Sequence, residues 1–232
     1  MKKNNNSKTI LTIETTSEIC GVSLIKNNKI IYENNVNNGF NHSITLFDNI
    51  FSSLKKCKLS MKDINIIKVS NGPGSFTGIR IGVAAAIGLS EIYNTKIEYI
   101  DTLDSLAYNV CGVNDVIISM IDAKNDRVYI SLFLSKSFKK VCDDFIINVY
   151  DLCKELNNSF KSSNIDFSLV GSGAVNYSKV FNKELNIKFK LYKVLSSLKA
   201  SSLGFVNGYK YQIPNINYLL NSKAERERNG KC

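Results

Sequence analysis

Residues 71–82 read Asn-Gly-Pro-Gly-Ser-Phe-Thr-Gly-Ile-Arg-Ile-Gly, and this stretch decides how the rest of the chain is interpreted. It follows an apolar strand expected at residues 66–69 and leads into a helix expected to run to about Tyr93. Glycine and proline favour a tight turn. Ser75 or Thr77 can cap the helix, whose first N–H groups have no partner within it. Such a turn at a helix N-terminus suits an anion.

The same segment offers a place where a second helix can pack. Gly78, Gly82 and Ala86 lie four residues apart and share one helical face, and small side chains let two helices approach closely. The segment could therefore bind a nucleotide, a partner protein or both, although a strand, a glycine turn and a small-residue helix are also ordinary packing devices. It is not a P-loop, because no Gly-Lys-Ser/Thr sequence follows the glycines.

Composition limits the class of protein. The chain has 232 residues, 44% of them apolar, which is enough for one large domain or two small ones. None of the six cysteines forms a Cys-x-x-Cys pair, and His42 is the only histidine, so a zinc site or disulfide framework has little support. No apolar run approaches the roughly 20 residues that span a bilayer. We expect a cytoplasmic protein with no membrane partner.

The net charge of +10 favours an RNA-related partner. The support is weak, because the lysines are spread along the chain and no RNA-recognition motif accompanies them. Much of the excess charge is also compatible with a solvated surface.

Hydrophobic patterns predict two similar halves. The first half is expected to contain strands at 9–13, 20–25 and 29–36, a hairpin turn at Asn27-Asn28, a helix starting near Asn41 or Ser43, a strand at 97–100 and a helix at 102–111. The second is expected to contain strands at 116–121, 127–134 and 139–147, a helix at 151–160, a strand at 167–170 and a helix after Gly171-Ser172-Gly173.

The order of elements indicates an internal repeat. Residues 10–14 align with residues 118–122, and each acidic end, Glu14 or Asp122, precedes a polar turn and an alternating strand. Two β-β-β-α-β-α units predict an α/β protein with two mixed sheets, each flanked by helices, and a cleft between them. This is the duplicated actin-like (ASKHA, ribonuclease H-like) fold, with subdomains expected at 1–112 and 113–232.

The chain resembles the TsaB family, also called YeaZ, over almost its full length. The matching pieces are residues 10–16, His42-Ser43, residues 71–82, residues 121–124 with Val128-Tyr129, and residues 217–219 with 223–228. The resemblance implies the dimerisation subunit of the bacterial machinery that makes threonylcarbamoyladenosine in tRNA. It also implies a TsaD-type catalytic subunit and a TsaE-type ATPase as partners, with tRNA as the substrate of the complex. ATP and metal are then expected in those partners, and no cofactor in this subunit.

The resemblance further implies that the first two helices of the N-terminal half, about 43–56 and 75–93, form the contact surface. The expected interface residues are Ser43, Phe47, Ile50, Phe51, Ser75, Thr77, Gly78, Arg80, Ile81, Gly82, Ala85 and Ala86. When the partner is missing, we expect the same helices to pair two copies of the chain, because an exposed apolar face seeks cover.

The resemblance implies a lost metal site and no catalytic residue. The catalytic relative carries a His-x-x-x-His pair, and by alignment its positions hold Thr102 and Leu106 here. The first strand also ends in Glu14, where the fold usually has aspartate. Candidate nucleotide-binding residues are Glu14, Thr15, Thr16, Asp122, Gly171 and Gly173, all of which equally fit strand ends and polar turns.

Two other functions stay open at the level of sequence. A kinase-like ATPase or phosphotransferase of the same superfamily needs metal-binding acids and a complete phosphate cradle, and Glu14 and Asp122 are the only well-placed acids. A peptidase needs a zinc pair or a nucleophile–base pair, which would have to use His42.

Overall fold

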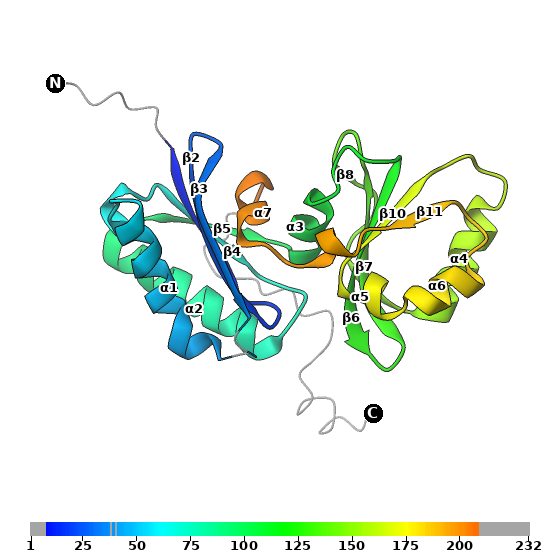
Figure 1. The fold of residues 1–232 in the computed structure, drawn as a ribbon, viewed down its shortest axis with the longest axis horizontal. Helices are drawn as coiled ribbons and strands as arrows, with labels where there is room; N and C mark the ends of the chain where they lie inside the picture. Colours follow the sequence, from blue (N-terminus) through cyan, green and yellow to red (C-terminus); the bar gives the residue numbers. More distant parts are fainter. Residues whose placement is uncertain (1–7, 38, 40, 209–232) are drawn as a thin grey trace. The chain divides into compact units, whose positions relative to one another are not determined.

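The computed structural model describes residues 8–37, 39 and 41–208, which form two compact units (Figure 1). The matching pieces at 217–219 and 223–228 lie outside the described residues. Of the described residues, 8–108 and 198–208 belong to the first unit and 109–197 to the second. The predicted boundary at residue 112 lies near the observed boundary between residues 108 and 109. The prediction that all later residues belong to the second unit was wrong, because residues 198–208 pack in the first unit.

The first unit is a mixed five-stranded sheet in the order β3-β2-β1-β4-β5. Its strands are β1 (Thr9–Glu14), β2 (Ile19–Lys26), β3 (Lys29–Asn37), β4 (Ile66–Ser70) and β5 (Lys96–Ile100). Its helices are α1 (His42–Lys56), η1 (Met61–Asp63), α2 (Phe76–Tyr93), α3 (Thr102–Tyr108) and α7 (Ala200–Phe205). Helices α1 and α2 cover one face of the sheet, while α7 packs on the other face and α3 packs on α7 (Figure 1).

The second unit repeats this topology in the order β11-β10-β6-β7-β8, with β9 also paired to β7. Its strands are β6 (Val116–Lys124), β7 (Arg127–Leu134), β8 (Lys139–Lys140), β9 (Phe145–Asn148), β10 (Phe167–Val170) and β11 (Phe189–Leu191). Its helices are α4 (Val149–Phe160), α5 (Ser172–Asn176), α6 (Ser178–Glu184) and η2 (Val194–Ser196). The two matching strand orders confirm the predicted duplicated fold.

One predicted strand was wrong. Residues 139–147 do not form a single strand but split into β8 and β9, which pair with opposite ends of β7. The polar pair Asp143-Asp144 lies between them, and aspartate is depleted in strands because its side chain competes for backbone hydrogen bonds.

Local chemistry explains most of the other boundaries. Asn27 and Asn28 have φ values of 50° and 60°, as a tight hairpin turn between β2 and β3 requires. The Ser75 hydroxyl accepts a hydrogen bond from the Gly78 N–H at 3.2 Å and so caps α2 as predicted. Asn41 precedes α1, but its side chain makes no capping hydrogen bond.

Helix α2 is long and apolar enough to cross a membrane by length and composition alone. In the first unit, however, it packs against the sheet. Gly82, Val83 and Leu89 are buried there, and this side of the helix covers β1, β4 and β5. The length and apolarity of α2 are therefore those of a helix that covers a core.

Side chains of the first sheet satisfy both ends of α7. The Ser201 N–H donates to Oε1 of Glu33 at 2.8 Å, near the helix N-terminus. Lys68, which is buried in β4, donates to the carbonyl oxygens of Gly204 at 3.1 Å and Val206 at 2.6 Å. An acid at the start and a cation at the end complement both the unpaired backbone groups and the helix dipole. These contacts hold the returning segment on the first unit.

Candidate functional site

The glycine-rich turn packs against the β1–β2 turn of its own unit. The Ser75 N–H donates to the Thr16 carbonyl at 2.7 Å, and the Thr15 hydroxyl donates to the Gly78 carbonyl at 2.7 Å. A Cβ on Gly74 would lie 2.5 Å from the Thr16 carbonyl oxygen, and one on Gly78 would overlap the Thr15 carbonyl oxygen. These glycines are needed because backbone approaches backbone here, whether or not a ligand binds.

The structure brings Glu14, Thr15 and Thr16 together. Oε1 of Glu14 and both threonine hydroxyls bond within the unit, while Oε2 of Glu14 is buried without a hydrogen-bond partner among the described residues. Oε1 of Glu14 accepts from the Thr16 N–H at 2.7 Å and from the Thr16 hydroxyl at 2.5 Å. Glu14 is fully buried, and burial raises the pKa of its carboxyl group, while the Thr16 hydrogen bonds oppose the rise. Both threonine hydroxyls are thus engaged, and the predicted nucleotide role of this trio gains no support.

Replacing Glu14 with glutamine is expected to change how stability depends on pH. In the parent chain, the contribution of Glu14 to the free energy of unfolding is greatest below its unfolded pKa near 4.5, and this contribution is lost as the pH rises toward the raised folded pKa. Glutamine cannot ionise, so between the unfolded and the folded pKa the free energy of unfolding of the variant rises relative to that of the parent, by up to about 1.4 kcal/mol per pH unit. Urea unfolding between pH 4 and 8 measures the difference. The matched control is Glu91→Gln at an exposed position of α2, and a Glu14→Gln difference that is independent of pH contradicts the prediction.

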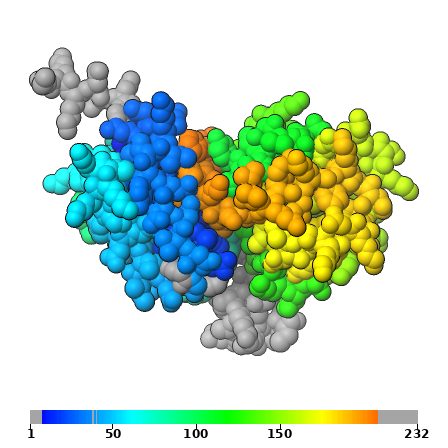
Figure 2. Space-filling view, in the orientation of Figure 1, coloured from blue at the N-terminus to red at the C-terminus, as the bar shows by residue number. Residues whose placement is uncertain are grey.

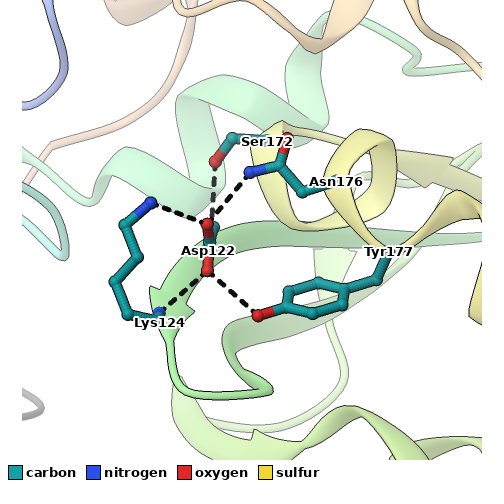
Figure 3. Close-up of polar contacts among 5 residues, drawn as sticks. All are labelled: Asp122, Lys124, Ser172, Asn176 and Tyr177. Atoms are coloured by element: carbon teal, nitrogen blue, oxygen red, sulfur yellow. Dashed lines mark hydrogen bonds and ion pairs between the residues drawn. The ribbon is translucent and has the colours of Figure 1, made fainter.

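In the second unit, Asp122 is held by a complete set of donors (Figure 3). It accepts from the Lys124 N–H at 2.8 Å and ammonium at 2.9 Å, from Asn176 Nδ2 at 2.9 Å and from the Tyr177 hydroxyl at 3.4 Å. The Asp122 N–H donates to the Ser172 hydroxyl at 3.1 Å. Partial burial works to raise the pKa of Asp122, but these hydrogen bonds outweigh it and lower the pKa. Asp122 therefore joins the end of β6 to α5.

The two remaining nucleotide candidates flank the start of α5. The Gly171 N–H donates to the Ser196 hydroxyl at 2.9 Å. A Cβ on Gly173 would lie 2.8 Å from Val128 Cγ1 and 3.0 Å from Met120 Cβ, so this glycine lets α5 pack closely on the sheet. The six candidates thus lie three to a unit, and in both units their contacts are those of packing and turns.

His42 has a structural place. It is buried at the start of α1, and its Nε2 lies 2.8 Å from the Ser17 carbonyl oxygen. A carbonyl oxygen only accepts, so Nε2 donates this hydrogen bond. The contact fastens α1 to the β1–β2 turn, and a peptidase dyad built on His42 gains no support from it.

Several of the expected interface residues are buried within the first unit, which corrects the prediction for them. They are Ile50 of α1 and Gly78, Gly82, Ala85 and Ala86 of α2. The spacing of Gly78, Gly82 and Ala86 suggested that a second helix could approach this face. The face instead covers the sheet, because a Cβ on Gly82 would overlap the Thr15 hydroxyl and lie near Val69.

A different row of small residues faces outward on α2. Thr77, Ala84 and Gly88 are exposed and Ile81 is half-buried, and a Cβ on Gly88 would meet nothing within 4 Å. Arg80 is also exposed, and its guanidinium lies 3.8 Å from the centroid of the Phe76 ring, in a cation–π contact. Ser75, the remaining candidate on this segment, is half-buried as the helix cap.

Helix α1 presents an apolar stripe. Ile44, Phe47 and Phe51 recur at helical spacing and are 73%, 44% and 47% exposed, and the two phenylalanine rings stack with centroids 6.3 Å apart. Ser43 is exposed at the start of the same helix. Because α1 and α2 contact each other on one face of the sheet (Figure 1), we define the α1–α2 surface as Ile44, Phe47, Phe51, Thr77, Ile81, Ala84 and Gly88. The interface prediction omitted Ile44, Ala84 and Gly88, although the spacing of 77, 81, 84 and 88 was visible in the sequence.

The sequence and the fold of this chain are similar to those of known proteins. Residues 37–225 match the family model described as TsaD: tRNA N6-adenosine threonylcarbamoyltransferase. The tRNA threonylcarbamoyladenosine biosynthesis protein TsaB of Bacillus subtilis is 33% identical over 129 residues, so the chain spans about half, 56%, of that relative. The protein of the same name from Buchnera aphidicola (subspecies Baizongia pistaciae) is 30% identical over 84% of this chain and 91% of its own length. The structure of YeaZ from Pseudomonas aeruginosa has a TM-score of 0.70 at 18% identity, covering 85% of this chain and 89% of that one.

Proposed function

The chain belongs to the TsaB family of tRNA threonylcarbamoyladenosine biosynthesis proteins, and we propose that it is a non-catalytic subunit that pairs with a TsaD-type catalytic subunit. The observation that carries this proposal is the exposed, apolar α1–α2 surface on a unit whose glycine-rich turn is filled by its own residues. In this proposal a TsaE-type ATPase joins the complex, the partner subunits hold ATP and metal, and the complex acts in the cytoplasm on the adenosine beside the anticodon.

The environment of Thr102 and Leu106 supports the non-catalytic part. Both side chains are buried in α3, and the Thr102 N–H donates to the Gly72 carbonyl at 2.7 Å. The resemblance implies that these positions correspond to the histidine pair of the catalytic relative, and leucine offers a metal no ligand atom. Turnover of ATP by the isolated chain in the presence of magnesium would contradict this part of the proposal.

The α1–α2 surface supports the pairing part. Two stacked phenylalanine rings and an isoleucine are exposed to solvent on α1. Burying apolar surface against a partner contributes about 25 cal/mol per Å² to the free energy of association, before its entropic costs. The neighbouring small residues of α2 let the backbone of a partner helix approach closely. Aromatic anchors beside a flat helical row are suited to an α-helical partner surface. The same surface is expected to pair two copies of the chain when the partner is absent.

Phe51→Ser is expected to weaken pairing by at least about 30-fold, which corresponds to about 2 kcal/mol for an aromatic anchor. The measurement is light scattering of the chain mixed at micromolar concentration with the TsaD-type protein of the same cell. The parent is expected to form a heterodimer. Ile30→Ser is the matched control, because Ile30 is exposed to a similar degree on β3 but lies outside the α1–α2 surface. Absence of a heterodimer with the parent chain would overturn the proposal, and equal losses in the two variants would remove the α1–α2 surface from it.

A further inference from the structure

The positive charge of the second unit is concentrated in one segment. Residues 109–197 carry 12 Lys and Arg and 9 Asp and Glu. Residues 179–193, the basic segment, hold five of the lysines and one acid, Glu184. The rest of the unit carries seven basic and eight acidic side chains and is nearly neutral. The positive excess of the unit therefore lies in α6, in β11 and in the turns on either side of β11.

The fold presents these lysines outward. Lys179 and Lys183 are one turn apart on α6, so their side chains project from the same side of the helix. Lys188 directly precedes β11 and Lys190 lies on it, and among the described residues β11 pairs with β10 alone. The two lysines are two positions apart in extended chain, so their side chains point to one face. All five lysines are exposed. The yellow and orange part of this unit in Figure 2 forms a continuous stretch of the visible surface.

Among the residues that the structure describes, acidic side chains pair with two of the five lysines. Lys188 pairs with Asp166 at 2.7 Å, and Lys183 pairs with Glu184 at 3.3 Å. Lys179, Lys190 and Lys193 form no ion pair with any residue that the structure describes. Three charges thus face solvent without a counter-charge from this part of the protein.

An aromatic ring accompanies the unpaired lysines. The ammonium of Lys190 lies 5.2 Å from the centroid of the half-buried Tyr192 ring. The Tyr192 N–H donates to the Leu169 carbonyl at 3.0 Å, which fixes the residue on β10. Lysines that track a phosphate backbone, combined with aromatic faces, are a recurrent arrangement in proteins that bind RNA.

Protection of the sheet edge accounts for part of this pattern only. Lysine on an edge strand discourages pairing with another chain, which explains Lys188 and Lys190. It does not explain Lys179 and Lys183 on a helix, where like charges four residues apart are mildly destabilising. Nor does it explain Lys193, which follows the strand.

We propose that the basic segment contacts phosphate groups of RNA and helps to hold the tRNA substrate. This inference rests on the proposed function, which supplies tRNA as the substrate of the complex. These contacts are to the phosphate backbone of the tRNA and carry no sequence information. The segment therefore adds affinity and orientation, while other parts of the complex recognise the base that is to be modified.

The test compares two triple variants in the full chain. Lys179→Gln, Lys190→Gln and Lys193→Gln remove the unpaired charges, while Lys136→Gln, Lys154→Gln and Lys161→Gln remove as many exposed charges elsewhere in the second unit. The probe is a fluorescent tRNA transcript that lacks modifications, and anisotropy is measured over a series of KCl concentrations, with and without the TsaD-type protein. The first triple variant is expected to weaken binding at least about tenfold near 0.1 M salt. It should also lower the slope of log Kd against log salt by about two to three, one unit or slightly less for each lost phosphate contact.

The control triple is expected to change affinity less than about threefold. Equal losses in the two variants, or tRNA binding by the first triple at the parent level, would overturn the proposal. Binding of the parent to anionic lipid vesicles in preference to tRNA would overturn it too. Light scattering of the same samples reports heterodimer formation separately, and the anisotropy of the chain alone still reports on the basic segment if no heterodimer forms.

Discussion

Gly78→Ala is expected to unfold the first unit under conditions where the parent chain is folded. The added Cβ would overlap the Thr15 carbonyl oxygen, and the hydrogen bond from the Thr15 hydroxyl to the Gly78 carbonyl fixes the two segments at that distance. Neither backbone segment can retreat, because the Ser75 N–H also bonds the neighbouring Thr16 carbonyl. A loss of about 3 kcal/mol or more is expected from this overpacking, and thermal unfolding followed by circular dichroism measures it.

Gly88→Ala is the matched control for that variant. It makes the same chemical change ten residues later on the same helix, where the new Cβ meets nothing within 4 Å. It should raise stability by up to about 1 kcal/mol, because alanine favours a helix over glycine. If Gly78→Ala folded with parental stability and failed only to bind the TsaD-type protein, Gly78 would belong to the partner interface and its role in packing would be refuted.

Lys68→Ala is expected to cost about 3–5 kcal/mol, as the removal of one partner from a buried ion pair does. Glu98, whose Oε2 lies 3.4 Å from the ammonium, would lose its counter-charge, and two carbonyl oxygens at the end of α7 would lose their donor. Burial lowers the pKa of Lys68 and Glu98 opposes that change, so the pair already carries a desolvation cost that only the complete set of contacts offsets. Urea unfolding gives the free-energy change.

Lys188→Ala removes a comparable lysine–carboxylate pair at the surface, where Asp166 lies 2.7 Å away, and should cost less than about 1 kcal/mol. Limited proteolysis of the Lys68→Ala variant adds a local measurement, because α7 is expected to detach before the sheet unfolds. Equal losses of stability in the two variants would mean that Lys68 does not hold the returning helix.

Elements whose signals are local could be predicted from sequence. The bounds of strand β7 were predicted correctly because its apolar residues alternate over its whole length. It pairs with β6, the strand that precedes it in the chain. The β2–β3 hairpin followed from Asn27-Asn28, since asparagine tolerates positive φ. The start of α2 followed from Ser75 and the glycines before it. The shared order of elements gave the duplicated fold, as the two sheets confirm.

What failed depends on contacts between distant residues. Helix α7 is short and rich in serine and glycine, and its docking depends on residues more than 100 positions earlier, among them Lys68 and Glu33. The outward face of α2 was misassigned because two rows on the helix both follow helical spacing and both contain small residues, and the contact with Thr15 shows which row is covered. The interface on α1 and α2 therefore stays a prediction, and five of its twelve expected residues are buried within the first unit.

The docking of α7 also bears on how the protein is made. The ribosome synthesises residues 8–108 first and then residues 109–197 before it reaches 198–208. Until then α7 cannot pack on the first sheet, and its contacts with Lys68 and Glu33 cannot form. The first unit is thus expected to complete its folding only after residues 198–208 have been synthesised, although its five strands are all made within the first 108 residues.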